Sequence, residues 1–184
     1  MTPVSKRICV YCSASRNLSP TYHEVAAQLG QLLAERRHTL IYGGGSVGLM
    51  GEVARAAHRG GGQIIGIIPK MLVSVEFAYQ QASEMIITED MRDRKARMDA
   101  HADAFLALPG GIGTLEEIFE IMSLRGLNQT ARPLVLINTG GFYDPLDEYL
   151  QKMRHEHFVR RPVNEIYYLA PDVYDALRYV EAHA

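Results

Sequence analysis

The sequence has no tryptophan, only two cysteines and no excess of positive charge. Its formal net charge of -2 provides no basic surplus to neutralise a nucleic-acid backbone, so extended nucleic-acid binding is not expected, whereas a small phosphorylated ligand remains compatible. No apolar run approaches the roughly 18 to 20 residues that span a bilayer, and the N-terminal pattern is not that of a signal peptide. These absences predict a cytoplasmic protein with no membrane partner.

The two cysteines, Cys9 and Cys12, form a Cys-x-x-Cys spacing. They lie in a short apolar segment that is typical of a buried strand, where positions 9 and 12 point to opposite faces. We expect two reduced thiols near the core. His155 and His157 are two residues apart and cannot share one side of a helix, so no metal site is predicted.

The composition is typical of a globular protein, with 47% hydrophobic and 22% charged residues. Residues 1–184 are therefore predicted to form one domain. Short apolar runs alternate with helical patterns, which indicates an α/β fold with a Rossmann-like, doubly wound, mostly parallel sheet. Strands are predicted at 6–12, 39–42, 63–68, 84–88, 103–108, 133–137 and 166–169, and helices at 20–36, 47–59, 91–101, 114–125, 143–156 and 171–182.

A first glycine-rich loop, Gly43 to Gly51, follows the strand predicted at 39–42. Glycines such as Gly44 and Gly45 let the backbone approach an anion at the start of a helix. A tight packing turn between strand and helix is the alternative. The spacing of Gly43, Gly45 and Gly48 resembles a dinucleotide-binding motif, but the acidic ribose-binding residue expected about 20 residues later is absent, so a dehydrogenase is disfavoured.

A second loop, Pro109 to Thr114, follows the buried strand predicted at 103–108. Its glycines permit close approach of the backbone, and the N-terminus of the next helix favours an anion. Glu116 and Glu117 follow in the first turn, where they could instead have a purely capping role. Adjacent helical residues point about 100° apart, so we expect only one of the two to face a small site.

The segment Pro109 to Glu117 fits the pattern PGGxGTxxE, and Met91 to Lys95 fits its companion MxxRK. With these two motifs and the first glycine loop in the same order, the chain resembles the LONELY GUY family of cytokinin riboside 5'-monophosphate phosphoribohydrolases. Some members carry the label lysine decarboxylase, for which no pyridoxal-phosphate lysine motif is visible here. The resemblance extends over almost the whole chain.

The resemblance implies hydrolysis of the N-glycosidic bond of a nucleoside 5'-monophosphate, cytokinin riboside 5'-monophosphate or AMP, without metal or organic cofactor. It implies that Glu117 stabilises the positive charge that builds on the sugar, and that Arg94 binds the substrate and favours departure of the base. It also implies a homodimer or larger homo-oligomer with sites near the subunit interface. The substrate-binding residues carried over from the family are Gly44, Gly45, Glu76, Arg94, Lys95, Gly110, Gly111, Ile112, Gly113, Thr114, Leu115, Glu116, Glu117 and Ser123.

Two features leave alternatives open. Molybdenum-cofactor carrier proteins resemble this fold and use a similar glycine-rich loop, so a non-catalytic nucleotide or cofactor carrier is the second hypothesis. Ile112 stands where relatives often have Tyr, and Ser123 where plant members often have Thr. These departures leave the preferred base undetermined.

Overall fold

The computed structural model describes residues 4–184 and contains one seven-stranded sheet between two layers of helices. All of its strand pairs are parallel, and the strand order is β4-β3-β2-β1-β5-β6-β7. The strands are β1 Arg7–Tyr11, β2 Thr39–Tyr42, β3 Ile64–Pro69, β4 Glu84–Thr88, β5 Ala104–Ala107, β6 Leu134–Ile137 and β7 Tyr168–Ala170. The helices are α1 Pro20–Glu35, α2 Gly48–Arg59, α3 Met91–His101, α4 Ile112–Gly126, α5 Asp144–His155, α6 Val163–Ile166 and α7 Val173–His183.

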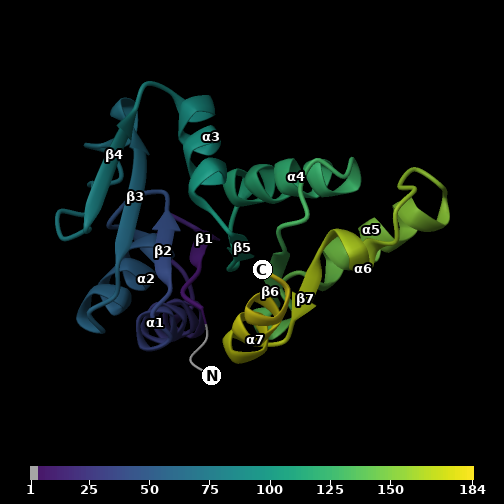
Figure 1. Ribbon diagram of the computed structural model, residues 1–184, viewed down its shortest axis with the longest axis horizontal. Coiled ribbons are helices and arrows are strands. Elements are labelled where there is room, and N and C mark those ends of the chain that lie inside the picture. The colour runs from purple at the N-terminus through teal and green to yellow at the C-terminus, as the bar shows by residue number, and fades with distance from the viewer. Residues whose placement is uncertain (1–3) are drawn as a thin grey trace.

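The helices cover both faces of the sheet (Figure 1). Alternation along β1 sends Ile8 and Val10 into a core shared with α1, α2 and α7, while Cys9 and Tyr11 enter a second core with α3, α4, α5 and α6. Both faces of each central strand are therefore buried, which explains why these segments are short and almost wholly apolar. This arrangement confirms the predicted doubly wound fold.

The ends of the predicted elements agree with the structure to within two residues. The helix expected from Thr114 begins at Ile112, because Gly111 serves as the N-cap and Gly113 continues the helix. The strand expected at 166–169 begins at Tyr168, because the short helix α6, which was not predicted, occupies Val163–Ile166. Pro20 occupies the first turn of α1, where its missing N–H has no helical partner to lose.

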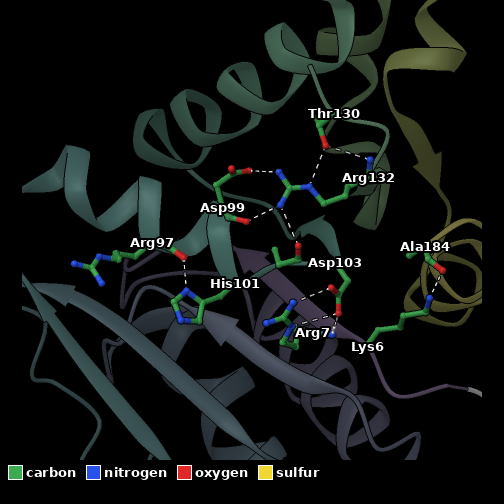
Figure 2. A network of polar contacts seen from close by, with 10 residues as sticks. Lys6, Arg7, Arg97, Asp99, His101, Asp103, Thr130, Arg132 and Ala184 are labelled. Carbon is green, nitrogen blue, oxygen red and sulfur yellow. Dashed lines mark hydrogen bonds and ion pairs between the residues drawn. The ribbon is translucent and has the colours of Figure 1, made fainter. Parts of the chain in front are cut away.

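At the amino ends of the strands, polar side chains join segments that are distant in sequence (Figure 2). Arg132 donates to the backbone oxygens of Asp99 and Ala102, at 2.6 and 3.0 Å, and to the Asp99 carboxylate at 2.6 Å. Arg7 donates through its backbone N–H to Asp103 at 2.8 Å. The first contacts fix the end of α3 to the segment before β6, and the last fixes the start of β5 to β1. Within residues 4–184, no helix is both long and apolar enough to cross a membrane.

Candidate active site

The site is located where the direction of the chain crossovers reverses. The central strand β1 lies between β2 and β5, so the loops that follow β1 and β5 diverge to opposite sides of the sheet. Ligands of doubly wound sheets bind in the crevice that such loops leave open. A cavity of about 260 Å³ opens there and is lined by Ser13, Ser15, Leu18, Tyr22, Pro109, Gly110, Gly111 and Phe142.

The second glycine loop leads into the N-terminus of α4, where no side chain caps the first turn. A side chain on Gly110 would overlap that of Thr114, so glycine is required there by packing. Side chains on Gly111 or Gly113, in contrast, would meet no atom of the described chain within 4 Å. The helix N-terminus is therefore open and presents backbone N–H groups and the positive end of its dipole, as an anion site requires.

Arg94 lies in the first turn of α3 and is only 6% exposed. Its Nε–H donates to the carbonyl of Ile67 at 3.2 Å, and Nη2 donates to the carbonyl of Gly43 at 3.1 Å. A third, weaker contact joins Nη1 to the sulfur of Met91 at 3.8 Å. A guanidinium has five N–H groups, so two remain for another partner.

No carboxylate forms an ion pair with this guanidinium anywhere in residues 4–184. A buried positive charge held only by carbonyl oxygens and a thioether sulfur is costly unless an anion or a polar ligand completes its environment. Arg94 is therefore poised to bind an anionic or electron-rich group.

Glu117 follows one turn into α4 and is half-buried. Burial raises the pKa of its carboxyl to about 7, against the opposing effect of the Arg94 charge, and the charges of Glu116 and Glu76 add to the rise. A carboxyl with a pKa near neutrality can alternate between charged and neutral forms, which suits a general base.

Lys95 and Glu116, on neighbouring helices, pair with each other. Lys95 forms ion pairs with Glu116 and with Glu120, the latter at 2.8 Å, and so ties α3 to α4. The hydrogen bonds that the Lys95 ammonium donates to these two carboxylates raise the pKa of Lys95. Glu116 is thus exposed while Glu117 is half-buried, so the two adjacent glutamates point in different directions.

The first glycine loop brings Glu76 to the same site. Gly44 has φ +77°, and a side chain there would press on Ile68 at 2.9 Å. At Gly45, an added Cβ would lie 3.2 Å from the Glu76 carboxylate. The glycines of this loop make room for residues of this chain, so the packing alternative explains Gly44 and Gly45. Residue 43 must also be glycine, because the Arg94 guanidinium packs against it. This requirement was missed from the sequence because 51 residues separate Gly43 from Arg94.

The remaining candidates lie around the start of α4 or beyond it. Ile112 is 83% exposed at the first helical position, and Leu115 packs against the core. Ser123 lies farther along α4, donates to the carbonyl of Phe119 at 2.8 Å, and lines an apolar groove between α4, α5 and α6. None of the other candidate residues lines that groove.

The two thiols take no part in a redox pair. Cys9 and Cys12 are free, buried and in different cores, as their spacing predicted. Burial, reinforced by the Glu117 charge, raises the pKa of both thiols, so neither is a ready nucleophile. In the described part of the chain, no cluster of three or more His, Cys, Asp or Glu side chains is arranged to hold a metal ion.

Comparison with known proteins identifies the family. The model of a family described as "Possible lysine decarboxylase" matches residues 50–180. The cytokinin riboside 5'-monophosphate phosphoribohydrolases LOG7 and LOG2 of Arabidopsis thaliana are each 43% identical to the chain over 178 residues, which is 97% of this chain and 82% and 84% of theirs.

Among solved structures, the molybdenum cofactor carrier protein of Chlamydomonas reinhardtii superposes with a TM-score of 0.72, covering 97% of this chain and 98% of its own. Its sequence identity is only 19%, so the likeness is one of fold. Sequence identity of 43% over 97% of the chain is far more specific. The chain belongs to the LONELY GUY family.

Proposed function

We propose that this chain hydrolyses the N-glycosidic bond of nucleoside 5'-monophosphates and releases the free base and ribose 5-phosphate. The observation that carries the proposal is the buried Arg94, which has no ion-pair partner, beside Glu117, whose pKa is near 7. The names of the relatives LOG7 and LOG2 support the same reaction.

In this proposal the 5'-phosphate binds at the open N-terminus of α4, around Gly111, Gly113 and Thr114. Glu117, one turn further, then lies near the anomeric carbon. As the base departs, positive charge builds on the sugar, and the carboxylate of Glu117 stabilises it and accepts a proton from the attacking water. Arg94 supplies hydrogen bonds and positive charge to the substrate, since its guanidinium does not lose its proton at neutral pH.

Release of ribose 5-phosphate from a panel of nucleoside monophosphates tests the reaction. We expect release from AMP or from isopentenyladenine riboside 5'-monophosphate, and loss of release in Glu117→Ala. Dialysis against a chelator should leave the activity intact, because the proposed reaction needs water as its only co-reactant. Nucleosides without phosphate should react poorly. Equal rates with a nucleoside and with its 5'-monophosphate would contradict phosphate binding at α4.

A non-catalytic carrier is the alternative that the fold likeness to the molybdenum cofactor carrier suggests. A carrier would bind AMP without turnover in both the wild type and Glu117→Ala. The proximity of Arg94 to Glu117 favours the enzyme. Measuring AMP binding and base release on the same samples separates the two.

We also propose that the chain acts as a cytoplasmic homodimer, and that AMP is a substrate alongside cytokinin nucleotides. The apolar groove beside α4 supports an interface, because its rim exposes Leu127 and Phe158, the latter by 80%. Sedimentation of the wild type and of Phe158→Asp tests this. A dimer that Phe158→Asp converts to a monomer is expected, and a monomeric wild type would contradict the assignment.

A further inference from the structure

The segment from Lys70 to Tyr79 crosses the first glycine loop and is fixed to it by backbone hydrogen bonds. The N–H of Ser46 donates to the carbonyls of Glu76 and Phe77, both at 3.0 Å, and the N–H of Tyr79 donates to Gly44 at 2.9 Å. Phe77 adopts φ 51°, a left-handed conformation that is rare for an aromatic residue. The backbone carbonyl of Glu76 is therefore held in place, and the residue after it has an unusual geometry of the kind that accumulates at functional sites.

The side chain of Glu76 carries a buried oxygen without a partner in residues 4–184. Its Oε2 atom has almost no exposure to solvent and no hydrogen bond within the described chain. A side chain on Gly45 would crowd this oxygen, with its Cβ only 3.2 Å away, so the glycine keeps room for the carboxylate itself. Burial raises the pKa of the Glu76 carboxyl, and the charge of Arg94 opposes the rise. An unpaired buried carboxyl oxygen is costly, and a substrate atom that hydrogen-bonds to it would remove that cost.

We infer that Glu76 is the proton donor to the departing base in the reaction proposed above, on which this inference rests. The Glu76 carboxylic acid gives its proton to a ring nitrogen of the base as the bond between that base and the anomeric carbon breaks. The oxygen of water bonds to the anomeric carbon, and its proton passes to the Glu117 carboxylate. Exchange with solvent then returns a proton to Glu76 and removes one from Glu117, so one water is consumed.

The other polar groups of the site are less suited to this step. The guanidinium of Arg94 keeps its proton near neutral pH. Glu117 must be ionised to stabilise the sugar, so it cannot also donate. The hydroxyl of Tyr42 also lacks a partner, but Tyr42 is fully buried in the core with α1 and α2 and cannot reach a ligand. Two carboxyls that serve opposite protonation roles are the usual arrangement for glycosidic cleavage.

The test compares a leaving group that needs a proton with one that does not. AMP requires protonation of its base, whereas p-nitrophenyl β-D-ribofuranoside 5-phosphate releases a stable phenolate. In Glu76→Gln we expect kcat/KM for AMP to fall by about 100- to 1000-fold and that for the nitrophenyl substrate by less than about 10-fold. Glu117→Gln should lose both activities, and Glu84→Gln, an exposed change on β4, should lose neither.

A second measurement uses the pH profile with AMP. If Glu76 is the acid, kcat/KM of the wild type falls at alkaline pH as that proton is lost, and this limb disappears in Glu76→Gln. Equal losses on both substrates, or an alkaline limb that persists in Glu76→Gln with unchanged melting temperature, would overturn the inference and leave Glu76 a binding residue. A wild type that hydrolyses neither substrate would instead refute the proposed function itself.

Discussion

The guanidinium of Arg94 occupies the space that a side chain on residue 43 would need. A Cβ added at Gly43 would overlap Arg94 Nη2, the atom that donates to the Gly43 carbonyl at 3.1 Å. The end of β2 and the first turn of α3 are thus fitted to each other at the candidate site.

Gly43→Ala should therefore displace Arg94 without disrupting the fold. We expect kcat/KM for AMP to fall by about 100-fold, the loss that a misplacement of about 1 Å can cause, with a small change in melting temperature. Gly126→Ala is the matched control, because a side chain there meets nothing within 4 Å in the described chain. Equal activities of the two variants would show that the contact with Gly43 is dispensable.

The pH dependence of the reaction should report Glu117. Because its pKa is about 7 and the carboxylate is the active form, kcat/KM should rise with pH through an acid limb near 7. The Glu116 charge raises the pKa of Glu117, so Glu116→Gln should move this limb to lower pH. Steady-state kinetics between pH 5 and pH 9 measure it, and a limb that stays in place or moves upward would contradict the coupling.

Ionisation of Glu117 should also weaken the fold. Its pKa is about 7 in the folded protein against an ordinary value of 4.5, so the folded state binds more protons between these values and stability falls as pH rises through that window. Glu117→Gln should therefore raise the free energy of unfolding at pH 8 by about 1 to 3 kcal/mol while it abolishes activity. Urea denaturation at pH 8 and pH 5 tests this, since at pH 5 the gain should largely vanish.

Arg132 should matter for stability alone. Arg132→Lys keeps the charge but loses the fork that binds Asp99 and Ala102, and we expect a loss of about 1 to 2 kcal/mol in the free energy of unfolding with kcat/KM unchanged. Arg97→Lys changes an exposed helical ion pair and serves as the control. A loss of activity in folded Arg132→Lys would show that the two edges of the sheet are coupled.

The sequence predicts the order and type of the main elements because the apolar runs and helical patterns are each local. The start of α4 at Ile112 was missed, since glycine is a poor helix former and Gly113 argues against a helix that begins before Thr114. The short helix α6 was missed because four residues are too few to show a period.

The motifs place Arg94 and Glu117 at one edge, but the contacts between Gly43 and Arg94 and between Gly45 and Glu76 join segments that are far apart in sequence. Ser123 is a different case. It is six residues after Glu117, which corresponds to about 240° around a helix, so the helical period alone separates the two.

The carboxyl and amino ends of the strands in this parallel sheet carry different groups of residues. The residues proposed for the reaction lie at the carboxyl ends of the strands. At the amino ends, hydrogen bonds of Arg7, Asp103 and Arg132 join neighbouring segments (Figure 2). Substitutions at distant positions combine nearly additively. Directed evolution of this chain can therefore select heat tolerance at one end and base preference at the other, in parallel libraries that are merged afterwards.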